Sequence, residues 1–380
     1  MSSDGLLTPS LTPEQTMLSD ASERFIEDAC PLEAVRRWMD EPDPLPPSYF
    51  EKSAPLGWYG LLAPEALGGG AVSDSPLADA VVVARQRGAT LQPGAFIGQN
   101  VVTHVLGAEK PGSELAAVAR RLVDGSARAS WALADATGDW SPGRSIRAES
   151  DGRSVVLTGR AGLVQDAHRV DWLLVAAETE SGLGQCLVPT DAPGLVVTPL
   201  ESLDLTKRFS TVHFEGVRVE GDRMVGDPAK AAARIEEQFQ RALILQVAES
   251  LGAMDALLRR TVAYAQDRIA FGRPIGSFQA IKHVLADQSL RVEGTRAVLA
   301  GAVEAVEGGA CDAPSIASIT KAYAGDTGVE LSQSCLQIHG GIGFTWEHDL
   351  HLYLRRLTSD AALFGDPIWH RERLANLHAK

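Results

Sequence analysis

Three long stretches of helical periodicity constrain the fold of this chain more than any other feature. Apolar residues recur at helical spacing over residues 232–267, 278–307 and 314–335. The turns that follow the first and the last of these stretches are rich in glycine, at residues 271–276 and 339–343. Helices of roughly 20 to 35 residues joined by short turns are typical of an antiparallel bundle. The sequence therefore predicts a C-terminal helical bundle.

The pattern changes between residues 127 and 225, where short β-type runs replace the helical period. Asp-Gly, Ser-Gly and Pro-Gly pairs, which mark turns, separate these runs. The runs occupy residues 154–158, 172–177, 194–200 and 211–219. Runs at this spacing without long helical inserts favour an antiparallel barrel or sandwich. No Gly-x-Gly-x-x-Gly follows a strand, so a Rossmann-type domain is not predicted.

Helical periodicity also dominates residues 12–122, ahead of the β-type region. Thr12 precedes Pro13, which places a capping side chain before a proline at the first helical position. The order of helices, strands and bundle gives an α+β chain with three predicted domains. Their ranges are 1–125 for the helical domain, 126–227 for the β domain and 228–380 for the bundle.

Composition excludes several classes of function. The 380 residues include 35 basic and 49 acidic side chains, a formal net charge of −14, so nucleic acid and an anionic membrane are not expected partners. No apolar run reaches the ~18 residues of a membrane span, and the first ten residues lack the layout of a secretion signal. The four cysteines lie far apart and the nine histidines form no HExxH motif, so no metal is expected. We therefore expect a cytoplasmic protein without a metal.

Three segments resemble signature sequences of the acyl-CoA dehydrogenases. Residues 264–287 contain YAQDRIAFGRPIGSFQAIKH and then LAD, residues 337–348 read QIHGGIGFTWEH, and residues 64–70 read PEALGGG. The three-part order also fits, so the chain is identified as a member of that family. The resemblance implies that the C-terminal bundle is a four-helix bundle. The resemblance implies an FAD flavoprotein that oxidises an acyl-CoA thioester to its trans-2-enoyl-CoA. It also implies that a carboxylate removes the α-proton, that flavin N5 takes the β-hydride, and that an electron-transfer flavoprotein accepts the electrons.

The resemblance further implies that residues of this chain reach the FAD of a neighbouring subunit. A guanidinium suits a pyrophosphate because it offers a fixed fork of donors, and glycines let the backbone approach a ligand closely. The matching residues are Arg268, Phe271 and Gln279 in the first C-terminal signature and Gln337, Gly340 and Gly341 in the second.

The segments that would hold the chain's own flavin depart from the family pattern. Where members carry Thr-Glu-Pro and Gly-Ser-Asp, residues 132–142 read ALADATGDWSP. The family's Trp-Ile-Thr/Ser segment corresponds to Leu163-Val164-Gln165, so its aromatic cover is replaced by leucine. The amide of Gln165 could still donate to flavin N5, which keeps this residue as a cofactor candidate.

The two positions that carry the catalytic base in the family also depart from the family pattern. The position of the usual glutamate holds Phe364, and the position that a minority of members use on an earlier helix holds Ala242. Two nearby acids, Asp366 and Glu249, are candidate replacements. The alternative for Asp366 is a cap in the loop beside Pro367, and the alternative for Glu249 is a structural carboxylate between helices.

Two further residues have both a structural and a functional interpretation. Lys207 precedes the last β-type run, where a structural ion pair is favoured over a contact to the CoA moiety. His339 lies in the second C-terminal signature and invites a catalytic role, but packing against neighbouring chain is favoured.

The chain keeps the residues that would complete a neighbour's FAD site, which we call the first half-site. It alters those that would hold its own flavin and remove the proton, which we call the second half-site. Three hypotheses follow from this asymmetry. In the first, the chain resembles the base-lacking β-type subunits of actinobacterial heteromeric acyl-CoA dehydrogenases and completes a partner's FAD site in an α2β2 assembly, acting on a fatty acyl or steroid side-chain thioester. In the second, it is a self-sufficient homotetramer with a relocated base such as Asp366. In the third, it is a flavin-free scaffold. The first is favoured, because packing alone does not require the Arg268, Phe271 and Gln279 set.

Overall fold

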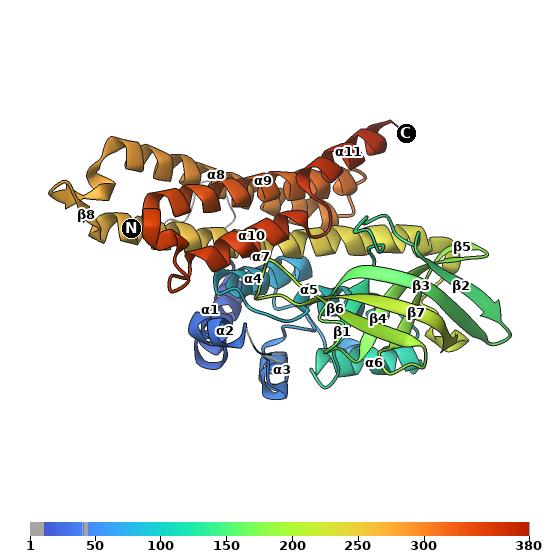
Figure 1. The fold of residues 1–380 in the computed structure, drawn as a ribbon. Helices are drawn as coiled ribbons and strands as arrows, with labels where there is room; N and C mark the ends of the chain where they lie inside the picture. The colour runs from blue at the N-terminus through green and yellow to red at the C-terminus, as the bar shows by residue number, and fades with distance from the viewer. Residues whose placement is uncertain (1–10, 40, 42–44, 380) are drawn as a thin grey trace.

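A computed structural model describes residues 11–39, 41 and 45–379 of the chain. The expectation about the first ten residues therefore lies outside the described residues. Figure 1 shows three parts that follow one another along the chain, namely N-terminal helices, a twisted sheet and long C-terminal helices. Within the described part, none of the helices has the length and hydropathy that crossing a membrane requires.

The described N-terminal residues form six α-helices that pack beneath the C-terminal ones. Thr12 caps the first helix, because its hydroxyl accepts a hydrogen bond from the backbone N–H of Gln15 at 3.2 Å and the Gln15 side chain accepts one from the N–H of Thr12 in return. The helices are α1 (Pro13–Ala29), α2 (Leu32–Trp38), α3 (Pro47–Ser53), α4 (Pro76–Ala89), α5 (Phe96–Gly107) and α6 (Glu114–Val123).

The middle of the chain forms a seven-stranded sheet with the order β1-β4-β2-β3-β7-β6, and β5 pairs with β4. Four strand pairs are antiparallel as predicted, but β1 and β2 both run parallel to β4, so the sheet is mixed. The reason is that the chain leaves the edge of β4 after β1, loops out over residues 133–145, and returns further along the same edge as β2. The strands are β1 (Ala129–Ala132), β2 (Ile146–Asp151), β3 (Ser154–Gln165), β4 (Trp172–Thr179), β5 (Gly182–Pro189), β6 (Leu195–Leu200) and β7 (Phe209–Glu220).

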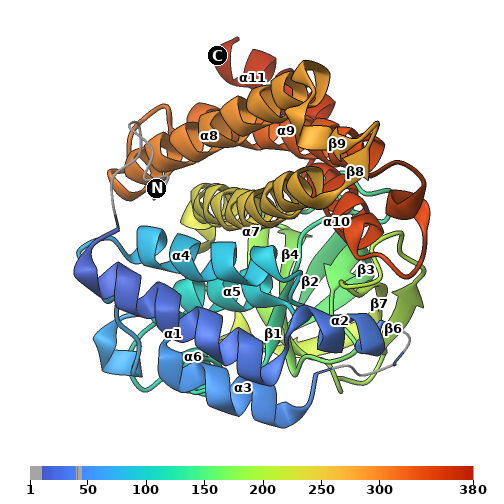
Figure 2. The same cartoon turned by 90° about the vertical axis from the view of Figure 1, so that its left-hand side faces the viewer.

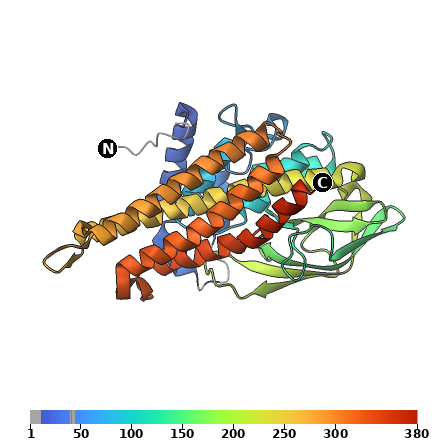
Figure 3. The same ribbon diagram turned by 90° about the horizontal axis from the view of Figure 1, so that it is seen from above.

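Long helices make up the C-terminal part, as the periodicity predicts. Helix α7 is the central one, since it packs against α4 and α5 on one side and against α8, α9 and α10 on the others (Figures 2 and 3). A further helix, α11, packs on α9. The elements are α7 (Ala231–Asp267), β8 (Ile269–Ala270), β9 (Arg273–Pro274), α8 (Gln279–Glu307), α9 (Ala313–His339), α10 (Leu350–Ala362) and α11 (Pro367–His378). Short 3₁₀ helices are η1 (Ala54–Leu56), η2 (Glu65–Leu67), η3 (Gly221–Arg223), η4 (Pro228–Lys230), η5 (Ile275–Ser277) and η6 (Gly340–Phe344).

The middle of α7 is buried on every side. Residues 242–254 are all buried, and a helix buried all round is expected to be apolar all round. The charged residue in this stretch is Glu249, which is 2% exposed. A carboxylate in such a place needs partners from other elements.

Candidate functional site

The hairpin β8–β9 projects from one end of the long helices and joins α7 to α8 (Figures 1 and 3). Arg268 follows the last residue of α7, Gln279 is the first residue of α8, and both are exposed. Phe271 at the hairpin tip is 95% exposed and has a φ of 52°. Both properties are unfavourable for a phenylalanine in an isolated chain. Among the described residues, the Arg268 guanidinium has no ion-pair partner, so the hairpin presents a cation and an aromatic ring to its surroundings.

The second signature lies at the same end of the helices. Gln337 and Gly341 are exposed, and Gly340 has a φ of 62°. A Cβ added to either glycine would meet no atom within 4 Å, so the backbone there is open to a ligand. The ring of Tyr264, one turn before the hairpin, stacks on His339 with 4.2 Å between ring centroids. The structure therefore brings together the signature set, which consists of Arg268, Phe271, Gln279, Gln337, Gly340 and Gly341.

The position that the family resemblance gives to the usual base is filled by an aromatic cluster. The Phe364 ring lies 4.9 Å from Trp140, 6.3 Å from Trp131 and 6.4 Å from Phe239, measured between centroids. These rings come from the loop after β1, from β1 itself and from α7, and each is at least 90% buried. Ala242, at the alternative base position, is completely buried one turn from Phe239. The altered turn and both altered base positions thus meet in one apolar region.

Gln165 lies apart from the signature set. This residue ends β3, is 9% exposed, and donates a hydrogen bond from its side-chain Nε2 to the backbone oxygen of Gly94 at 2.8 Å. The amide therefore holds the loop between α4 and α5. Leu163, which replaces the family's aromatic cover, has a φ of 50° and reaches the loop at Gly138.

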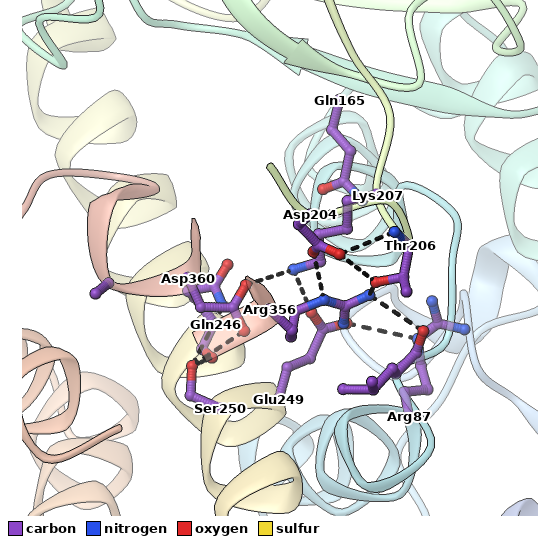
Figure 4. A network of polar contacts seen from close by, with 12 residues as sticks. Arg87, Gln165, Asp204, Thr206, Lys207, Gln246, Glu249, Ser250, Arg356 and Asp360 are labelled. Carbon is purple, nitrogen blue, oxygen red and sulfur yellow. Dashed lines mark hydrogen bonds and ion pairs between the residues drawn. The ribbon is translucent and has the colours of Figure 1, made fainter. Parts of the chain in front are cut away.

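A buried ionic network surrounds Glu249 (Figure 4). Lys207 Nζ contacts Glu249 Oε2 at 2.8 Å and Asp360 Oδ1 at 3.0 Å. Arg87 Nε lies 3.7 Å from Glu249 Oε1, and Arg356 donates to Asp204 at 2.7 Å. All six side chains are at most 2% exposed. Three cations thus face three anions, from α4, the loop before β7, α7 and α10.

The network sets the charge state of Glu249. Burial alone would raise the pKa of this carboxyl, but Lys207 and Arg87 outweigh burial and hold its pKa below the usual value. A carboxylate that is paired on both oxygens is a poor proton acceptor. Glu249 therefore takes the structural role between helices, and Lys207 makes a structural ion pair.

Asp366 caps helix α11. Its Oδ1 accepts a hydrogen bond from the backbone N–H of Trp369 at 2.7 Å, and the side chain is exposed. Because asparagine caps a helix about as well as aspartate does, we expect Asp366→Asn to keep the stability of the chain within about 0.5 kcal/mol. Since a capping residue is not the base, acyl-CoA turnover, measured with a partner chain where one is needed, should stay within about tenfold. Steady-state kinetics and urea unfolding measure these two quantities. A loss of about 100-fold or more in turnover with unchanged stability would assign the base to Asp366.

The buried His370 on α11 should make the free energy of unfolding depend on pH. Its ring is fully buried and Nε2 lies 3.0 Å from the backbone oxygen of Phe364, and burial lowers its pKa from 6.5 to about 3. The unfolded chain therefore takes up a proton as the pH falls below about 6.5, whereas the folded chain does not until about pH 3. Stability should fall by roughly 2 kcal/mol between about pH 7.5 and about pH 5 through this residue.

Urea unfolding at the two pH values tests this expectation. His370→Gln should remove that part of the pH dependence, while His378→Gln, an exposed histidine on the same helix, should leave it unchanged. Equal losses of stability on acidification in the wild type and in His370→Gln would contradict the prediction.

Most of the ionic network was not predictable from the sequence. Arg87, Asp204, Arg356 and Asp360 were not site candidates, because their pairing depends on contacts between distant segments. One signal was present in the sequence, namely the single carboxylate of Glu249 inside an apolar stretch of helix. A charge in that setting requires buried counter-charges, although the sequence does not say where they come from.

Comparison with known proteins gives the family. Residues 12–109 match the model of the acyl-CoA dehydrogenase N-terminal domain, and residues 232–376 match that of the C-terminal domain. The acyl-CoA dehydrogenase IpdE2 of Mycolicibacterium smegmatis is 29% identical over 374 residues, covering 97% of this chain and 99% of that protein. IpdE2 of Mycobacterium tuberculosis is 30% identical over 325 residues, covering 86% of this chain and 83% of that protein.

Solved structures agree with this assignment. The ChsE4–ChsE5 complex of Mycobacterium tuberculosis contains a chain that is 25% identical with a TM-score of 0.87, covering 98% of both chains. A variant of the Tcur3481–Tcur3483 steroid ACAD contains one that is 27% identical with a TM-score of 0.87, covering 96% of this chain and 98% of that one. The chain therefore belongs to the acyl-CoA dehydrogenase family of FAD-dependent oxidoreductases.

Proposed function

We propose that this chain is a subunit of a heteromeric acyl-CoA dehydrogenase, and that it completes the FAD site of a base-bearing partner chain in an α2β2 assembly. The observation that carries the proposal is the contrast between its two half-sites. The signature set lies at one end of the long helices and is exposed except at the half-buried Gly340, while the usual base position is filled by the Phe364 aromatic cluster. A chain that turned over substrate on its own would need a proton-accepting carboxylate at the base position.

The residues of the first half-site suit a dinucleotide. Arg268, whose guanidinium has no ion-pair partner among the described residues, would pair with the pyrophosphate, and Phe271 and Gln279 would lie along the dinucleotide. The open backbone at Gly340 and Gly341 would approach the adenosine half. When bound, FAD accepts the hydride from the β-carbon of the substrate.

The residues of the second half-site do not suit catalysis. Phe364 and Ala242 offer no proton acceptor at either family position, Glu249 is paired with two cations, and Asp366 caps a helix. The Gln165 amide is engaged with Gly94. Removal of the α-proton is therefore assigned to a carboxylate of the partner chain.

The similar structures support a two-component assembly. Two of them are described as pairs, ChsE4–ChsE5 and Tcur3481–Tcur3483, and the second is described as a steroid enzyme. A steroid side-chain acyl-CoA is therefore the first substrate to test, with a straight-chain fatty acyl-CoA as the comparison. An electron-transfer flavoprotein is the proposed acceptor.

Co-expression with candidate partner chains tests the proposal. We expect this chain to co-purify with a second dehydrogenase-like chain, and the pair to turn over one of the two thioesters, with each chain alone at least about 100-fold slower. Efficient turnover of either thioester by this chain alone would contradict the proposal. Turnover by a partner alone at the rate of the pair would contradict it as well.

A further inference from the structure

The two segments of the signature set come from distant parts of the chain, so their separation is fixed by the packing of α7 against α9 and by the contacts at the ends of these helices. The hairpin carries Arg268, and the glycine-rich loop begins at Gly340. Tyr264 is tied to the start of the hairpin, because its backbone oxygen accepts a hydrogen bond from the N–H of Arg268 at 2.8 Å. His339 directly precedes the loop. The contact between Tyr264 and His339 therefore links the two segments.

That contact is a close ring stack. The Tyr264 and His339 rings lie 4.2 Å apart between centroids and 17° from parallel. The Tyr264 hydroxyl also donates to the backbone oxygen of His339 at 3.4 Å. His339 is 5% exposed, and its Nδ1 donates to the backbone oxygen of Cys335 at 2.9 Å, which fixes the ring on the last turn of α9. Both hydrogen bonds end on backbone oxygens in the last turn of α9, at Cys335 and His339, so this turn holds both rings.

A third ring secures the far end of the glycine-rich loop. The His348 ring meets that of His339 edge-on at 5.2 Å. Its Nδ1 accepts a hydrogen bond from the backbone N–H of Leu350 at 3.2 Å, which ties it to the start of α10. Tyr264, His339 and His348 together form what we call the ring stack.

The glycine-rich loop has little other support at the residues that the signature set uses. Nothing lies within 4 Å of a Cβ at Gly340 or Gly341, and Gly340 has a φ of 62°, which glycine adopts easily and leaves easily. The position of this backbone therefore depends on the residues on either side of it. His339 anchors the first side; on the second, Gly343 is buried against Leu336 and His348 anchors the end of the loop.

We propose that the ring stack sets the distance between Arg268 and the backbone of Gly340–Gly341, so that both reach one dinucleotide in the partner chain. Its three members are positioning residues and do not themselves contact the cofactor. The inference rests on the proposed function, since that function supplies the ligand that spans the two segments. A stack that served packing alone would stabilise the chain without affecting the affinity for FAD.

The first test examines the stack in the chain alone, without a cofactor. Amide hydrogen exchange should become at least about tenfold faster at residues 268–274 and 340–345 in His339→Ala, with exchange in the sheet unchanged. His378→Ala, which removes an exposed histidine, is the matched control and should change neither segment. Unchanged exchange at both segments in His339→Ala would overturn the inference.

The second test measures FAD affinity in the assembly of both chains after the flavin has been removed and is added back. Tyr264→Ala and His339→Ala should each weaken FAD binding about tenfold, measured by fluorescence titration. Tyr264→Phe keeps the ring and loses only the long hydroxyl contact, so its affinity should stay within about twofold. Faster exchange with unchanged FAD affinity in the alanine variants would overturn the positioning role.

Failure of the proposed contact between Arg268 and FAD gives a different result. In that case the assembly with Arg268→Gln would bind FAD as tightly as the wild-type assembly. The proposed role of the ring stack in FAD binding would then be wrong as well. The exchange measurement would still decide whether the stack holds the two segments together.

Discussion

Replacing Arg268 by glutamine should lower the turnover of the assembled dehydrogenase by about 100-fold and leave it largely without flavin. The guanidinium is exposed and has no ion-pair partner among the described residues, so its charge is available to a pyrophosphate. Two charge-assisted hydrogen bonds are worth roughly 3 kcal/mol or more together, which corresponds to a factor of about 100 or more in affinity. Flavin absorbance of the purified assembly and its acyl-CoA turnover measure the two effects.

The controls for this variant separate charge from geometry. Arg259→Gln removes the same charge from the exposed end of α7, and it should leave both flavin content and turnover unchanged. Arg268→Lys keeps the charge without the fork and should give an intermediate loss. Arg268→Gln should not alter the stability of the chain alone. Full flavin content in Arg268→Gln would contradict the account of the hairpin.

Replacing Glu249 by glutamine should destabilise the chain by about 3 kcal/mol or more. Removing one carboxylate from a network of three cations and three anions leaves one buried positive charge uncompensated. Arg87 would lose its ion pair with Glu249, and Lys207 would keep only Asp360. Urea unfolding followed by circular dichroism measures the loss. An unchanged stability together with a loss of turnover would instead assign a catalytic role to Glu249.

A double-mutant cycle shows whether the loss comes from the ion pair. Lys207→Met alone should also be strongly destabilising, because it leaves Glu249 and Asp360 facing each other. The double variant Glu249→Gln and Lys207→Met should be at least about 1 kcal/mol more stable than the sum of the two losses predicts. Additive losses would mean that the two side chains do not interact.

Most of the helical part of the fold was predictable from the sequence. The first predicted stretch, 232–267, differs by one residue from α7, and the second, 278–307, differs by one residue from α8. The third ends too early, since α9 continues to His339 through the start of the signature. Long amphipathic or buried helices show a clear helical period of apolar residues in the sequence, so their positions are predictable.

Strand pairing and buried contacts were less predictable. The predicted runs correspond to β3, β4, β6 and β7, whereas β1, β2 and β5 were not predicted as strands. Alternation also identifies a strand but not its neighbour, so the parallel pairing of β1 and β2 with β4 was missed. The meeting of Trp140 with Phe364 joins residues that are distant in sequence, and so does the pairing of Arg356 with Asp204. Local patterns do not carry such information. The exposure of most of the signature set agrees with the family resemblance, which implied that these residues reach a neighbouring subunit.

The stoichiometry of bound FAD tests the central claim most directly. The chain expressed alone should purify colourless, and the assembly with its partner should contain about one FAD for every two chains, as expected if each flavin needs one chain of each kind. A yellow protein obtained from this chain alone, with about one FAD per chain and full acyl-CoA turnover, would contradict the account.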